Sequence, residues 1–294
     1  MGTLYIIGNG FDLHFNLKTK TDNFVQCLKT QPVYNEINNA LDVLNYYGVD
    51  WNEYEQSLND INLDEIEYQN EIYPDYLSDR ESDRDGGILN MQMYVESISD
   101  AINSALEQMV KAANNEAMKL PPHNYNKQIF QKGDAILSFN YTSTFEYLFD
   151  MPTVVPVFYI HGCYKQGEPL IFGYRNNHNS YPTTWSSMDE DSWDYYIVQQ
   201  REIVYDFYEN WRKKLQLNEL SKFLTNCYAI DRIVVLGHSM SAVDAEYMEQ
   251  IEQSIRPIVW NISYYGETDI KRIQSQNYSF QGKIEFSHME ELLI

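Results

Sequence analysis

The stretch that most constrains the fold lies near the start of the chain, where an apolar run at residues 3–7 ends directly in Gly8-Asn9-Gly10. A short apolar, β-branched run predicts a buried strand, and glycines after it predict a loop whose backbone approaches a ligand closely. If a helix follows, its first free amide groups suit a phosphate. Leu13 replaces the third glycine of a dinucleotide fingerprint. The stretch therefore predicts either a nucleotide or phosphate site or an ordinary strand–loop corner.

Further segments, most of them apolar, have the length and composition of short strands. They lie at residues 134–139, 156–160, 170–173, 232–236, 257–262 and 283–286. Longer stretches with apolar residues at helical spacing separate many of them. Strands that alternate with helical stretches predict an α/β fold with a doubly wound, mostly parallel, Rossmann-like sheet.

Two large helical insertions are expected, at about residues 33–120 and 186–226, within a single domain that covers residues 1–294. The first insertion contains a charged segment at residues 78–87 that ends in Gly86-Gly87 and is typical of a surface loop. We expect the insertions to cap the carboxyl ends of the strands, where open parallel sheets bind their ligands.

Acidic residues outnumber basic ones by 43 to 21, which gives a formal net charge of −22 at pH 7. A field of this sign repels nucleic acids and anionic membranes, so we expect neither as a direct partner. The three cysteines form no CxxC pair, which predicts a cytoplasmic protein without a metal site or disulfide framework. No apolar stretch reaches the ~18–20 residues of a membrane span. A protein partner and a homo-oligomer both stay open.

Four of the predicted strands end in small or polar residues, and these ends are expected to meet at one edge of the sheet. They are Gly8-Asn9-Gly10, Asn140, His161-Gly162 and Gly237-His238-Ser239. An imidazole titrates near pH ~6.5, so His161 is a candidate base; the alternative is a hydrogen-bonded histidine without a chemical role. Asn140 can donate and accept at once, which suits a ribose hydroxyl or a water, although asparagine is also a common turn residue.

The segment Gly237-His238-Ser239 also invites comparison with the nucleophile elbow Gly-x-Ser-x-Gly of α/β-hydrolases. However, Ser241 stands in place of the final glycine, and only His288 follows Ser239 as a histidine. We therefore rank a serine hydrolase at Ser239 third among the possible functions. The preferred interpretation is that Gly237 and Ser239 contact a ribose or a phosphate. An ordinary NAD dehydrogenase is excluded, because a helical insertion stands where its ribose-binding acid should follow the glycine loop by ~20 residues.

The motifs recur together in one known group of proteins. They are residues 4–14, Phe139-Asn140-Tyr141-Thr142, Ile160-His161-Gly162, and residues 235–239 with Asp244. This succession resembles the AbiH family, bacterial proteins of abortive infection against bacteriophage, over nearly the full chain. AbiH proteins in turn resemble the sirtuin-like NAD-binding fold, which makes NAD the implied substrate or ligand.

The resemblance also implies roles for the strand-end residues. It puts the loop with Gly8-Asn9-Gly10, Phe11 and Asp12 at the NAD phosphates, Asn140 and His161-Gly162 at the catalytic centre, and Gly237-His238-Ser239 at the adenosine half. Thr142 departs from the sirtuin motif, which carries Asp there, and the zinc cysteine pairs of lysine deacylases are missing. The implied activity is hydrolysis of NAD rather than deacylation.

The expected enzyme is an NAD glycohydrolase (NADase) that breaks the nicotinamide–ribose bond. Such a site must stabilise an oxocarbenium-like ribose and position a water. Asn140 would hold the water and a ribose hydroxyl, and His161 would act as base. Asp12 would bind a ribose hydroxyl or steady the cation, with a helix cap or a surface ion pair as equal alternatives. The alternative function is a non-catalytic nucleotide-binding sensor or interaction module.

Overall fold

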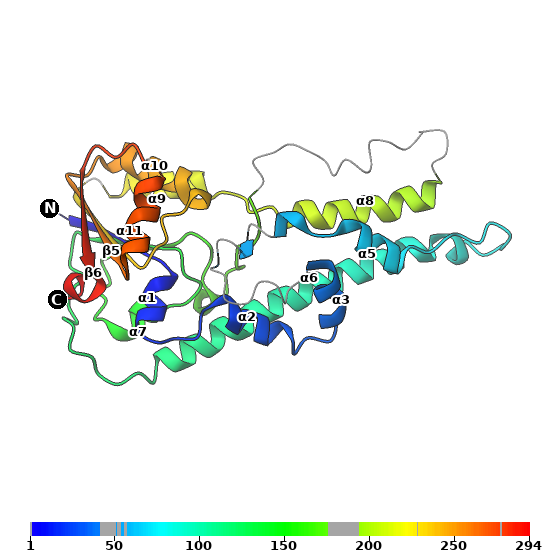
Figure 1. Cartoon of the computed structure of the whole chain (residues 1–294), viewed down its shortest axis with the longest axis horizontal. Helices are drawn as coiled ribbons and strands as arrows, with labels where there is room; N and C mark the ends of the chain where they lie inside the picture. Colours follow the sequence, from blue (N-terminus) through cyan, green and yellow to red (C-terminus); the bar gives the residue numbers. More distant parts are fainter. Residues whose placement is uncertain are drawn as a thin grey trace. The chain divides into compact units, whose positions relative to one another are not determined.

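The computed structural model, drawn in Figure 1, describes residues 2–41, 51, 54–55, 58–175, 194–227, 229–276 and 278–294. Contacts divide the chain into two compact units. Unit 1 comprises Met1–Lys20, Glu107–Ile171 and Lys214–Ile294, and unit 2 comprises Thr21–Leu106 and Phe172–Lys213. The organisation as a single domain with insertions stays a prediction, and parts of both insertions, including residues 42–50 and 186–193, lie outside the described residues.

Unit 1 contains a six-stranded sheet, and each strand runs parallel to its neighbours in the order β3-β2-β1-β4-β5-β6. The strands are β1 (Gly2–Ile7), β2 (Ala135–Ser138), β3 (Val157–Tyr159), β4 (Ile230–Leu236), β5 (Val259–Tyr264) and β6 (Lys283–His288). This confirms the predicted α/β, Rossmann-like fold. Because successive strands are added on one side of β1 and then on the other, the strand order reverses between β1 and β4.

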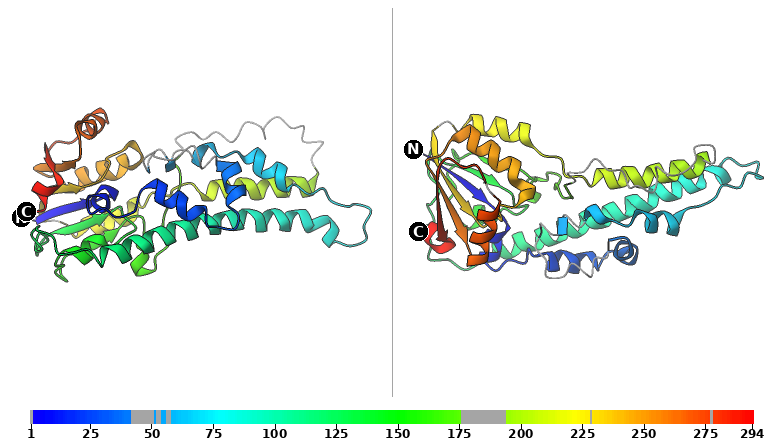
Figure 2. Two further views of the ribbon diagram at one scale, coloured as in Figure 1. Left: turned by 60° about the horizontal axis from the view of Figure 1, so that its bottom comes forward. Right: turned by 45° about the horizontal axis from the view of Figure 1, so that its top comes forward.

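Both faces of the inner strands β1, β2 and β4 are largely buried, as their apolar sequences predict. In β1, Leu4 and Ile6 point into one core cluster, and Ile7 points into another. Helices α9 (Leu217–Thr225), α10 (Ala245–Ile255) and α11 (Glu267–Ser275) supply the first core, and α1 (Asn9–His14), α7 (Thr144–Leu148) and α12 (Met289–Leu292) the second. Figure 2 shows these two helical layers around the strands.

The prediction of a strand at residues 170–173 is wrong. These residues form no strand; the adjacent Tyr174 makes an isolated bridge to Arg212. The amide of Ile171 donates instead to the carbonyl of His161 at 2.9 Å. The short apolar run is therefore a loop packed against the turn after β3.

Unit 2 consists largely of helices. They are α2 (Thr21–Leu28), α3 (Tyr34–Leu41), α5 (Leu63–Asn70), α8 (Tyr195–Asn210) and the first part of α6 (Ser82–Ala117), whose last part belongs to unit 1. We predicted a surface loop at residues 78–87. Because α6 begins at Ser82, this prediction is wrong for residues 82–87. Gly86 and Gly87 lie inside the helix, where Gly87 packs closely against the carbonyl of Ile72. None of the helices in the described segments is both long and apolar enough to cross a membrane.

The two helical glycines should respond oppositely to alanine. A Cβ added at Gly86 meets nothing within 4 Å, so Gly86→Ala should raise the free energy of unfolding by about 0.5–1 kcal/mol. A Cβ at Gly87 would lie 2.7 Å from the Ile72 carbonyl oxygen, so Gly87→Ala should lower it. Urea unfolding of both variants checks this, and equal stabilisation by both would contradict the close packing of Gly87.

Candidate functional site

The loops after β1 and β4 pack backbone to backbone at the carboxyl edge of the sheet. The amide of Gly8 donates to the Leu236 carbonyl at 3.0 Å, and the amide of Gly10 donates to the Gly237 carbonyl at 2.7 Å. A Cβ on Gly8 would come within 2.5 Å of the His238 Cα, and one on Gly10 within 2.7 Å of the Gly237 oxygen. These glycines are required by the contact between the two loops.

The sequence suggested that Gly8 and Gly10 make room for a ligand, whereas the structure shows that they make room for the loop after β4. The amide of Phe11 donates to the Gly8 carbonyl at 2.9 Å, so the amides of Gly8, Gly10 and Phe11 all have partners within the protein. The binding of a phosphate by this loop stays a prediction, and the glycines have a structural reason that does not depend on a ligand.

Two other residues of the opening loop serve the fold. The Asn9 side chain donates from Nδ2 to the Thr19 carbonyl at 3.1 Å and so holds the segment that follows α1. Phe11 is fully buried and packs against the rings of Phe15 and Phe149. The Phe11 side chain belongs to the core and offers no surface to a ligand.

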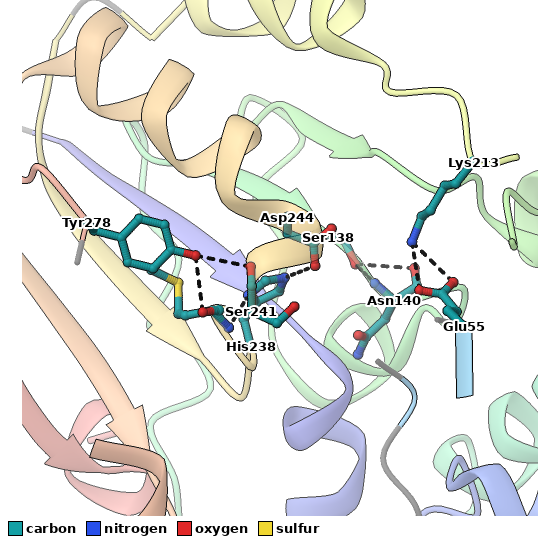
Figure 3. Close-up of polar contacts among 9 residues, drawn as sticks. Glu55, Ser138, Asn140, Lys213, His238, Ser241, Asp244 and Tyr278 are labelled. Atoms are coloured by element: carbon teal, nitrogen blue, oxygen red, sulfur yellow. Dashed lines mark hydrogen bonds and ion pairs between the residues drawn. The ribbon is translucent and has the colours of Figure 1, made fainter. Parts of the chain in front are cut away.

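Asn140 connects the end of β2 to the end of β1. Its Nδ2 donates to the Gly8 carbonyl at 3.1 Å, and its backbone amide donates to the Ser138 hydroxyl at 3.2 Å, as Figure 3 shows for Ser138. Asn140 as a whole is 7% exposed. The amide group is thus held in one orientation beside β1, which a residue that positions a ligand requires.

Asp12 is the buried carboxylate of this region. It projects from α1 and is 1% exposed, so the surface ion pair considered for it is wrong. Its Oδ2 accepts from the Thr142 hydroxyl at 2.6 Å. Burial raises the pKa of Asp12 to about 6, and the neutral polar side chains of Thr142, Thr144 and Asn140 beside the carboxyl limit the rise.

His161 follows β3 and is 5% exposed. Its ring lies edge-on to Phe139, with centroids 5.3 Å apart, and 6.2 Å from Tyr247. The neighbouring Gly162 has a φ of 80°, and a Cβ there would lie 2.1 Å from the Pro169 carbonyl oxygen. Gly162 is therefore needed for the turn that presents His161.

His238 also packs against Phe139, at a centroid distance of 4.2 Å. Its Nδ1 accepts from the Met240 amide at 3.0 Å, and its Nε2 lies 3.3 Å from Oδ2 of Asp244 (Figure 3). Because Nδ1 is an acceptor, Nε2 holds the proton that faces Asp244. Both ring nitrogens are used within the protein, so His238 orders the turn after β4. Asp244 was named in the sequence only as part of the motif around residues 235–239, and its pairing with His238 was missed.

The turn after β4 differs from a nucleophile elbow. The left-handed backbone falls on Gly237 and Met240, with φ of 69° and 52°, and not on Ser239. The hydroxyl of Tyr278 donates to the carbonyls of Met240 and Ser241 at 3.1 and 3.2 Å, which fixes this turn (Figure 3). The serine-hydrolase alternative loses support, because the strain is not at Ser239.

The structure therefore brings the four predicted strand ends together. Gly8 contacts Asn140 and Leu236, and the rings of His161 and His238 both pack against Phe139. Within the described part of the chain, no three His, Cys, Asp or Glu side chains gather in a way that could hold a metal ion. Figure 3 also draws the Glu55–Lys213 ion pair, which belongs to unit 2.

Comparison with protein families identifies a relationship for most of the chain. A family model described as bacteriophage abortive infection AbiH matches residues 4–264. This region reaches from β1 to β5 and contains all the strand-end residues described above. No curated protein matches the chain.

Proposed function

The chain belongs to the AbiH family of bacteriophage abortive infection, and from this premise we propose that it acts by hydrolysing NAD at the carboxyl edge of its sheet. The reaction breaks the bond between nicotinamide and ribose. It consumes one water, releases neutral nicotinamide and one proton, and leaves ADP-ribose. Loss of NAD starves an infected cell, which fits a role in abortive infection.

The observation that carries the proposal is the strand order β3-β2-β1-β4-β5-β6. In open sheets of this order, dinucleotides bind outside the carboxyl ends of the strands, where the order reverses. Here that point lies between β1 and β4, whose loops meet at Gly10 and Gly237. Asn140 touches the same place through the Gly8 carbonyl.

Asn140 and His161 are assigned the chemical roles. Nicotinamide leaves as a neutral molecule, so the site has to position a water and stabilise a cationic ribose. Asn140 is held on Gly8 through Nδ2, and its Oδ1 is suited to accept from a ribose hydroxyl or the attacking water. His161 comes from the adjacent strand and accepts the proton of that water.

The proposal is tested by incubating the purified protein with NAD and quantifying nicotinamide and ADP-ribose by chromatography. We expect both products in equal amounts, because water is the acceptor. NAD in phage-infected cells that produce the protein is measured in parallel, since infection can supply a trigger that the purified protein lacks. No product in the test tube and no NAD loss in infected cells would overturn the proposal.

A nucleotide-binding sensor without catalysis is the second candidate. The setting of His161 among aromatic rings favours it, because such a ring is also explained by packing alone. Tight binding of NAD by calorimetry without any product would support this candidate.

A further inference from the structure

Asp12 carries a carboxylate whose charge is not balanced by any described residue. The side chain is 1% exposed, and only Oδ2 has a hydrogen-bond partner, the Thr142 hydroxyl at 2.6 Å. Oδ1 accepts no hydrogen bond from the residues that the structure describes. The side chains that act on this carboxyl are Thr142, Thr144 and Asn140, and all three are neutral.

Such an arrangement is unfavourable for the fold by itself. Removal from water disfavours the charged form and raises the pKa of Asp12 to about 6, and three neutral donors offset only part of this effect. An asparagine of the same shape could accept from Thr142 without the buried charge. The hydrogen bond therefore explains an oxygen at this position but not a negative charge.

The position of Asp12 connects it to the strand-end site. Asp12 stands on α1, two residues after Gly10, and its partner Thr142 follows Asn140 by two residues. Asn140 itself bonds to Gly8 and acts on the Asp12 carboxyl. The unbalanced charge thus lies beside the residue that we assign to the ribose.

We propose that Asp12 makes the site selective for a ligand with a positive charge next to Asn140, that is for a cationic N-glycoside such as oxidised NAD. This inference rests on the proposed function. A negative charge in an interior of low dielectric attracts a cation over several ångströms, so direct contact is not needed. The same field stabilises the cation that develops on the ribose when nicotinamide leaves.

The test measures binding and does not require turnover. Carba-NAD, which cannot be hydrolysed, is compared by calorimetry with its reduced form, whose nicotinamide ring is neutral. We expect wild-type protein to bind the cationic form about 10- to 100-fold more tightly. In Asp12→Asn this ratio should fall to about 1, with the affinity for the reduced form nearly unchanged.

Asp134→Asn is the matched control, because Asp134 is also a buried carboxylate of unit 1. Asp134 lies just before β2, at the amino ends of the strands, opposite the proposed site. Its carboxylate accepts hydrogen bonds from the amides of Thr3 and Gln131. Its substitution should leave the binding ratio as in wild type. An effect as large as that of Asp12→Asn would show that selectivity comes from overall charge.

Thermal unfolding shows whether the Asp12→Asn variant folds. The pKa of Asp12 in the folded chain lies above its ordinary value of 3.8, so the charged form destabilises the fold as pH rises through about 6. At pH 7 we expect Asp12→Asn to raise Tm by about 2–4 °C, with a smaller difference at lower pH.

The outcomes separate the two proposals. An unchanged binding ratio in a folded Asp12→Asn variant overturns the role of Asp12. Selective binding of carba-NAD by a wild type that releases no nicotinamide from NAD and causes no NAD loss in infected cells overturns the proposed hydrolysis and leaves the role of Asp12 intact. A wild type that binds neither form overturns both.

Discussion

Replacing His161 with glutamine should lower the rate of NAD hydrolysis by about 10²- to 10⁴-fold, the usual contribution of a positioned general base. Glutamine retains a polar group and most of the volume among the rings of Phe139 and Tyr247, but it cannot take up a proton. The effect should appear in kcat at saturating NAD. His161→Ala should show the same loss of rate together with lower stability, because it leaves a cavity.

His288→Gln is the matched control for the loss of a strand-end histidine. His288 ends β6, and its Nε2 contacts the Tyr264 hydroxyl at 3.1 Å. Its replacement should change kcat less than about 2-fold, since it lies on the far edge strand. Full activity of a folded His161→Gln variant would remove His161 from the reaction and leave the water without an assigned base.

Replacing Gly237 with alanine should lower the free energy of unfolding by about 3–5 kcal/mol or prevent folding altogether. The new Cβ would lie 2.1 Å from the Phe11 amide nitrogen and 2.4 Å from the Gly10 carbonyl carbon. Both atoms belong to the backbone at the start of α1, so neither can move without separating the loops after β1 and β4. The φ of 69° adds strain for any residue with a Cβ.

Gly167→Ala is the control that separates the steric clash of a Cβ at position 237 from the strain of a positive φ. The φ of Gly167 is 70°, but a Cβ there meets nothing within 4 Å. Gly167→Ala should therefore lower the free energy of unfolding by only about 1 kcal/mol. Urea unfolding followed by circular dichroism measures both variants. Similar losses for the two would show that the loops after β1 and β4 are not in tight contact.

The sheet could be predicted because each strand is marked by a local pattern. The apolar runs at residues 134–139, 156–160, 232–236, 257–262 and 283–286 coincide with β2 to β6. Burial on both faces makes the runs of β2 and β4 nearly continuous, and helices between the strands favour parallel pairing. Local patterns failed where packing determines the secondary structure. Gly86 and Gly87 are typical of a loop in sequence, yet both lie inside α6.

The contacts within the site could not be predicted, because they join residues far apart in the sequence. The Thr142 hydroxyl reaches Asp12 across 130 residues, and no periodicity reveals such a pair. The opening glycines were expected to make room for a ligand, yet the space beside them is taken by Gly237 and His238. Sequence reasoning identified the strand ends that meet, but not which groups they present to each other.

The central place of β1 has a consequence for synthesis of the protein. The β1 residue Thr3 bonds to Asp134, 131 residues later, and β4 is made later still. At about 5–20 residues per second, a ribosome keeps β1 without its first partner for on the order of ten seconds. A nascent or broken chain that stops before Gly237 lacks one wall of the strand-end site. Under the proposed function, unfinished copies of the chain would therefore not hydrolyse NAD in the cell that makes them.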